Sequence, residues 1–150
     1  DEQNFKRYNA KSVSLANYSP FSFSENLLFI SGQLPIVNGK LKYSGQIDSN
    51  FDALKISESV LISTTNIIWV VNDFLEQLDK KVKNIRCLNL KGYFNSNSSF
   101  TDHSKYLDIA SNLIVQILGK QNGTHSRVAI GVSSLPKNSP VEIEALFSIF

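Results

Sequence analysis

Residues 51–79 lie within the longest stretch of the chain without glycine or proline, and they constrain the fold more than any other segment. Apolar residues such as Val60, Ile67, Val71 and Phe74 recur there at steps of three and four, the period of an amphipathic helix. The stretch "TTNIIWVV" inside it is β-branched and typical of strands. Its length and its polar spacers favour a helix, so we predict a helix over 51–79 with an apolar stripe to be covered.

A second helix is predicted over residues 105–119, where apolar residues again recur at helical spacing. Thr101 or Ser104 is the expected N-cap, because hydroxyl side chains accept hydrogen bonds from the first free N–H groups. Gly119 is the expected end of the helix, since glycine adopts the left-handed conformation that follows a last turn.

The remaining regular segments have the alternation or the β-branched content of strands. They are 21–24, 26–34, 84–94 and two runs within 124–150. The first two form a hairpin that turns near Glu25 and Asn26, and residues 35–48 are predicted to be a loop with a turn at Asn38 and Gly39. This order predicts a two-layer α+β domain, a mixed sheet with two helices on one face. The other face is then solvated or buried against another subunit.

Size and composition indicate one ordinary globular domain over residues 1–150, with 1–16 as a peripheral N-terminal segment. The formal charge of +2 comes from interspersed side chains, which favours neither nucleic-acid nor membrane binding. Cys87 is the one cysteine, so no internal disulfide forms. The start of this sequence is polar and no apolar run reaches about 18 residues, so we expect a cytoplasmic protein.

The two C-terminal runs carry charges that an ordinary core strand lacks, and side chains alternate along a strand. In the first run we assign the apolar set to the helix side and the set with the arginine to the open face: Val128, Ile130 and Val132 against Arg127, Ala129, Gly131 and Ser133. In the second run the core set is Val141, Ile143, Ala145 and Phe147, and the open set is Glu142, Glu144 and Leu146. The open face is therefore predicted to combine an arginine with two carboxylates.

Arginine offers a planar fork of donors that suits a carboxylate ligand, and glutamate can order or deprotonate water. The alternative is a solvated face with a structural Arg–Glu pair. The histidines, His103 and His125, form no metal-ligand spacing with Cys87, and we interpret Cys87 as a buried small apolar residue.

Two separated segments resemble one known family. "SRVAIGVSSLPKNSPVEIEALFSI" at 126–149 is similar to the C-terminal signature of the YjgF/RidA superfamily of enamine/imine deaminases, also called endoribonuclease L-PSP-like. "NYSPFSFSENLLFISGQLP" at 17–35 is similar to its N-terminal pattern, and the resemblance spans roughly residues 17–149. The segment between them resembles a divergent, chorismate-mutase-like subgroup.

The resemblance implies a chorismate-mutase-like fold, a homotrimer with clefts between subunits, and hydrolysis of 2-imino or enamine acids to 2-keto acids and ammonia without a cofactor. By position, Arg127 would clamp the substrate carboxylate and Glu142 would hold the attacking water. Gly32 would offer a backbone contact and Tyr18 would line the cleft.

Three further positions belong to the expected substrate site. Phe100 falls where the family order places an aromatic residue, and His125 lies two residues before the arginine. Ala129 stands where the well-characterised deaminases have cysteine, which leaves the substrate open. The alternatives are a non-catalytic trimer that binds small carboxylates and, ranked last, an RNA-cleaving enzyme.

Overall fold

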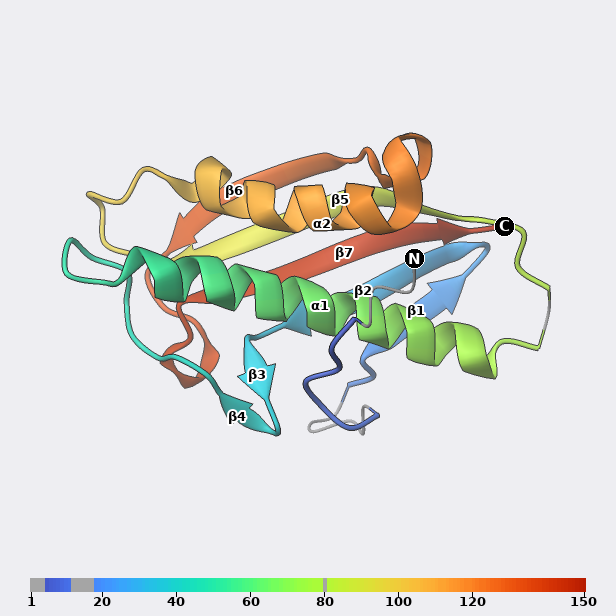
Figure 1. Ribbon diagram of the computed structural model, residues 1–150, viewed down its shortest axis with the longest axis horizontal. Coiled ribbons are helices and arrows are strands. Elements are labelled where there is room, and N and C mark those ends of the chain that lie inside the picture. Colours follow the sequence, from blue (N-terminus) through green and yellow to red (C-terminus); the bar gives the residue numbers. More distant parts are fainter. Residues whose placement is uncertain (1–4, 12–17, 80) are drawn as a thin grey trace.

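The computed structural model describes residues 5–11, 18–79 and 81–150, which form a sheet covered on one face by two helices (Figure 1). The elements in chain order are β1 Phe21–Ser24, β2 Leu27–Gln33, β3 Ile36–Val37, β4 Lys40–Leu41, α1 Ala53–Gln77, β5 Ile85–Asn95, α2 His103–Gly123, β6 Ser126–Val132, a 3-10 turn Pro136–Asn138 and β7 Val141–Ile149. The predicted order of two helices and five main strands is confirmed.

The main sheet has the order β1-β2-β7-β5-β6. Strands β5 and β6 run parallel and their connection contains α2, whereas the other neighbours are antiparallel. Helix α1 packs on β7 and β2, and α2 packs on β5 and β6 (Figure 1). This arrangement is the predicted mixed sheet with both helices on one face.

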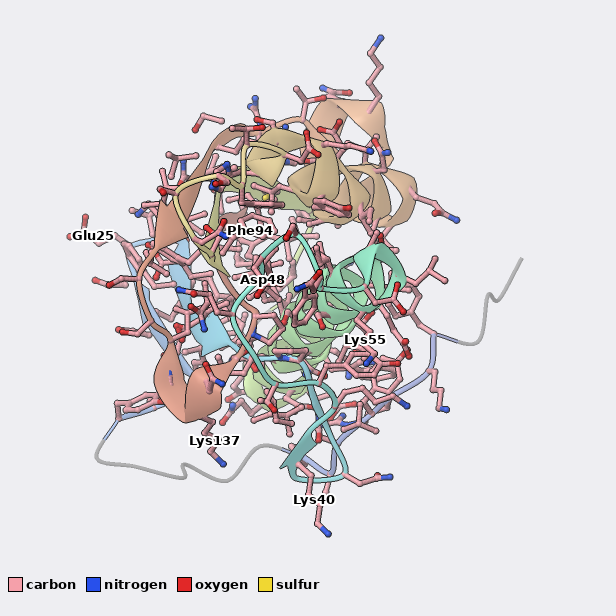
Figure 2. The ribbon with its side chains drawn as sticks, turned by 90° about the vertical axis from the view of Figure 1, so that its left-hand side faces the viewer. Glu25, Lys40, Asp48, Lys55, Phe94 and Lys137 are labelled. Carbon is pink, nitrogen blue, oxygen red and sulfur yellow. The ribbon has the colours of Figure 1, made fainter. Side chains whose placement is uncertain are left out.

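The core lies between the two layers. Phe94 of β5, Phe147 of β7 and Ile67 of α1 are completely buried there, and Figure 2 shows Phe94 between the sheet and the helices. Helix α1 begins after Asp52, whose side chain accepts a hydrogen bond from the backbone N–H of Leu54. By length and composition α1 passes a test for a membrane span, but most of it is buried as a core helix.

The ends of α2 differ from the prediction. Asp102 occupies the N-cap position in place of Thr101 or Ser104, and its side chain makes no capping hydrogen bond. Gly119 has a φ of 81° and interrupts the helix, but helical structure resumes and continues to Gly123. The glycine was correctly recognised as a break, whereas the helix continues beyond it.

Both predicted turns exist. Glu25 and Asn26 have φ values of 49° and 71°, the left-handed conformations that a two-residue hairpin turn requires. Asn38 and Gly39 have values of 51° and 79°. The second turn joins the short strands β3 and β4, so the segment predicted as a loop contains a small hairpin.

Residues 5–11 lie against α1 and the β3–β4 hairpin, away from the sheet. Arg7 donates two hydrogen bonds to the carboxylate of Asp73, at 2.7 and 2.6 Å, and its guanidinium lies 5.0 Å from the ring centroid of Trp69. Asn9 donates to the carbonyl oxygen of Ile36 and to the side chain of Asn66. This part of the predicted peripheral segment is therefore anchored to the domain; the rest of 1–16 lies outside the described residues.

Candidate functional site

Arg127 points toward the helices, so its predicted side of the sheet is wrong. It pairs in register with Leu90, which is completely buried on the helix side. Its Nη1 donates to Ser111 Oγ at 2.9 Å, and its Nη2 lies 2.8 Å from Oδ1 of Asp108. Both partners belong to α2, so the guanidinium lies between α2 and β6.

The apolar set of β6 takes the opposite face. Val128 and Ile130 are 40% and 42% exposed on the open side of the sheet. Strand β6 is an edge strand, and the adjoining surface of α2 offers polar groups, so a long arginine is accommodated on the helix side. Apolar side chains on a strand usually mark the core, and here that rule fails because their face is open in a single chain.

His125 reaches Arg127 through Ser111. Its Nε2 lies 2.9 Å from Ser111 Oγ, and its Nδ1 lies 2.6 Å from the carbonyl oxygen of Gly123. A carbonyl can only accept, so Nδ1 carries the proton and, in the neutral ring, Nε2 accepts from the hydroxyl of Ser111. The hydroxyl oxygen is then free to accept from Arg127, and the three side chains form one oriented chain.

Ala129 and Phe100 also lie on the helix side. Ala129 shares the face of Arg127 and packs partly buried against the core. Phe100 belongs to an aromatic cluster at the start of α2, with ring centroids 4.7 Å from His103, 5.9 Å from Phe94 and 6.0 Å from Tyr106. The methyl side chain of Ala129 brings no reactive group to this face.

Glu142 lies on the open face, as predicted. Its neighbours Val141 and Ile143 are buried toward the helices, so its own side chain points the other way. A Cβ at Gly32 would stand only 2.9 Å from Cδ of Glu142, so this glycine makes room for the carboxylate. Among the residues that the structure describes, no hydrogen bond or ion pair reaches this carboxylate. Burial, and then the nearby Glu144, raise the pKa of Glu142 above its ordinary value.

Other polar side chains surround Glu144 on the same face. Tyr93 donates from its hydroxyl to Glu144 at 3.3 Å, and Nζ of Lys91 lies 3.3 Å from the same carboxylate. Burial raises the pKa of the Tyr93 phenol, and the Glu144 charge adds to the effect. Next to them is a hollow of about 790 Å³, whose lining includes Tyr18, Ser31, Asn89, Lys91, Glu144 and Leu146.

The predicted site residues thus form two groups. Arg127, Ala129, His125 and Phe100 lie on the helix side, whereas Glu142, Gly32 and Tyr18 lie on or beside the open face. One chain does not bring the arginine and the carboxylate together. Asp108 and Ser111 are not among the residues predicted for the site, although their three-residue spacing on a predicted helix is a recognisable sign of a shared face.

Neither a metal centre nor a reactive thiol emerges from the described ranges. Within residues 5–11, 18–79 and 81–150 there is no group of three His, Cys, Asp or Glu side chains placed to hold a metal ion. Cys87 is completely buried in the core, and burial raises the pKa of its thiol to about 12. A thiol with that pKa stays protonated at neutral pH, which argues against a nucleophilic role.

Comparisons with known proteins agree with this architecture. The family model described as "YjgF/chorismate mutase-like, putative endoribonuclease" matches residues 7–148. The protein TCP17 of Trypanosoma cruzi is 30% identical over 140 residues, which cover 93% of this chain and 86% of the relative.

Two crystal structures are also similar. A protein of unknown function from Agrobacterium tumefaciens has a TM-score of 0.80 at 36% identity, over 90% of this chain and 83% of that one. A "putative endoribonuclease" from Shewanella oneidensis has a TM-score of 0.81 at 30% identity, over 96% and 92% of the two chains. Because the family model covers nearly all of the described fold, the chain belongs to the YjgF/chorismate mutase-like family.

Proposed function

We propose that the protein hydrolyses reactive 2-imino or enamine acids to 2-keto acids and ammonia, in clefts between copies of the chain. One observation carries this proposal. Arg127 and Glu142, the two groups that such a reaction needs, lie on opposite faces of the same sheet. A small substrate can touch both only if one copy supplies the arginine and a neighbouring copy supplies the carboxylate.

For this reaction the protein mainly has to position the substrate and a water molecule. Arg127 clamps the substrate carboxylate and fixes the C=N carbon in front of a water molecule held by Glu142. Glu142 removes a proton from that water as the water oxygen bonds to the carbon, and it returns this proton to the nitrogen, which gives a carbinolamine. Glu142 then moves the hydroxyl proton of the carbinolamine to the nitrogen as the C–N bond breaks, so that imino acid and water give keto acid and ammonia.

The state of Glu142 supports this role. A general base works best when its pKa approaches the working pH, and burial together with Glu144 shifts the pKa of Glu142 in that direction. The absence of a hydrogen bond or ion pair to it from any described residue leaves its lone pairs for water. Gly32 keeps the adjoining space open.

The open face supports an assembly of several copies, for which we propose a homotrimer. Phe29 of β2 is 50% exposed at one side of that face, and Val128 and Ile130 of the edge strand β6 are 40% and 42% exposed at the other side. Large apolar side chains exposed on a sheet face that no helix covers are the kind of surface that another copy can bury. An interface that joins the Arg127 edge of one copy to the open face of the next is head-to-tail, and such an interface forms a ring when the rotation between copies closes.

The test follows keto-acid release from 2-iminobutyrate generated in situ. Wild type is expected to accelerate release, and Arg127→Ala and Glu142→Ala to lose the acceleration by about 100-fold or more. Arg86→Ala and Glu25→Gln, which change exposed side chains of the same types, are the matched controls and retain activity. If wild type gives no acceleration over buffer with several imino acids, the deaminase proposal fails.

A second candidate is a protein that binds small carboxylates without turnover. Arg127 favours it, since the guanidinium is fully oriented within one chain and already contacts a carboxylate. This candidate predicts that Arg127→Ala abolishes binding of 2-oxobutyrate, whereas Glu142→Ala retains it and no variant turns over imino acids. Ribonuclease activity ranks below both, because the formal charge of +2 is dispersed along the sequence.

A further inference from the structure

Arg127 already binds a carboxylate, and that carboxylate comes from its own chain. Oδ1 of Asp108 lies 2.8 Å from Nη2 of Arg127, the distance of a close ion pair. Asp108 lies on α2, three residues before Ser111 and four after Ser104. Its carboxylate therefore occupies part of the position that a ligand carboxylate would take on the guanidinium.

The pair is open to exchange. The side chain of Asp108 is 60% exposed, and that of Arg127 is 25% exposed. Ion pairs near the surface contribute little, because water screens the attraction and two long side chains lose freedom when they meet. An incoming carboxylate can therefore replace Asp108 without breaking a buried contact.

The other contacts of Arg127 remain when Asp108 leaves. Ser111 Oγ accepts from Nη1 at 2.9 Å, and the carbonyl oxygen of Ser104 accepts from Nη2 at 3.3 Å. Both acceptors are uncharged, so they orient the guanidinium without neutralising it. His125 in turn holds Ser111, which keeps the arginine in place while its charge is exposed to a ligand.

We propose that Asp108 is a built-in competitor on Arg127, and that it sets the affinity of the site for ligands that carry a carboxylate. The inference rests on the proposed role of Arg127 as the carboxylate clamp. In the free protein Asp108 neutralises the guanidinium; a ligand carboxylate displaces it, and Asp108 returns when the keto-acid product leaves. Removal of the competitor strengthens binding, the opposite of what the loss of a structural contact does.

The experiment titrates the full-length protein with 2-oxobutyrate by calorimetry, for wild type, Asp108→Asn and Arg127→Ala. Asp108→Asn is expected to lower Kd roughly two- to five-fold, the range set by an exposed ion pair. In turnover assays it lowers KM by a similar factor and leaves kcat unchanged. Asp102→Asn is the matched control: it removes the same charge from the start of α2, where the Asp102 side chain makes no capping bond, and it leaves Kd unchanged.

The increase in affinity for 2-oxobutyrate must also disappear in the double variant Arg127→Ala/Asp108→Asn, because the guanidinium for which Asp108 competes is then absent. If Arg127→Ala abolishes binding but Asp108→Asn leaves it unchanged or weakens it, the proposal that Asp108 is a competitor fails, while the proposed role of Arg127 stands. If Arg127→Ala leaves both binding and turnover intact, the proposed function fails and the competitor with it. Equal thermal unfolding midpoints of wild type and Asp108→Asn exclude misfolding as the cause of a change in Kd.

Discussion

At the scale of single residues, Glu142 and Arg127 show two ways of holding a charge at a site. Glu142 has no hydrogen bond or ion pair from any described residue, and burial beside Glu144 makes its ionised form unfavourable. Arg127 is held by Ser111 and Asp108. These surroundings fit the proposed roles of the carboxylate in proton transfer and of the guanidinium in binding.

The raised pKa of Glu142 predicts a pH-dependent gain in stability for Glu142→Gln. A carboxyl group whose folded pKa exceeds its unfolded pKa stabilises the fold below the unfolded value, and this contribution is lost as pH rises through the folded value. The neutral glutamine avoids that loss. We expect a higher free energy of unfolding for the variant at pH 7, and equal values below about pH 4, where the wild-type carboxyl is protonated.

Urea unfolding at the two pH values measures this difference. Glu25→Gln makes the same chemical change at an exposed turn and serves as the control. A Glu142→Gln variant that is less stable than wild type at pH 7 would show that the ionised carboxylate has a favourable partner.

Gly32→Ala tests the space beside Glu142. The added Cβ would stand 2.9 Å from Cδ of Glu142, so the carboxylate must move away from its water position. A displacement of about 1 Å at a reacting group can cost up to about 100-fold in rate, so we expect a large fall in kcat. In the Glu142→Ala background the same substitution should have little further effect. Equal losses in both backgrounds would assign Gly32 a role independent of Glu142.

At the scale of elements, the sequence predicts where the helices and strands lie. It predicts less well which side of each strand points toward the helices. For α1 and β7, only one orientation buries the apolar side chains, because both elements are central and packed. In strand β6, either of the two alternating sets of side chains could point toward the helices. The choice depends on α2, which supplies Ser111 and Asp108 to the arginine, and on an open face that tolerates Val128. Tertiary contacts of this kind are not encoded in the local pattern.

Two ion pairs join residues 5–11 to α1, and we expect their removal to lower the free energy of unfolding by unequal amounts. Asp73 is almost completely buried and takes both its hydrogen bonds from Arg7, so Arg7→Ala leaves a buried charge without a partner. We expect a loss of about 3 kcal/mol in the free energy of unfolding. Lys11→Ala removes an exposed pair with Glu76 from the same segment and should cost less than about 1 kcal/mol.

Urea unfolding of the two variants gives the comparison directly. Similar small losses for both would mean that residues 5–11 detach from α1 in solution and that Asp73 is then hydrated. A double variant, Arg7→Met with Asp73→Leu, should recover much of the loss, because no buried charge remains.

At the scale of the whole molecule, one protomer holds Arg127 and Glu142 on opposite faces of its sheet, and we propose them as two halves of a shared site. The helix side carries the proposed carboxylate clamp near the edge strand β6, and the open face carries, beside Gly32, the carboxylate that we propose holds water. The family resemblance of the sequence singled out these residues, and their separation within one copy is the reason for proposing a site shared between copies. The pairing of half-sites between copies depends on an interface, and a strand pattern does not determine how copies pack.

Mixed assembly of two inactive variants tests this central claim most directly. Arg127→Ala and Glu142→Ala are mixed in equal amounts, unfolded and refolded together so that their chains exchange. If each site takes its arginine from one chain and its carboxylate from the next, random assembly makes about one quarter of the sites intact, so we predict about 25% of wild-type imine hydrolysis. Refolded separately, each variant stays inactive. A mixture that is as inactive as its components, although mass analysis shows mixed oligomers, would contradict the shared site.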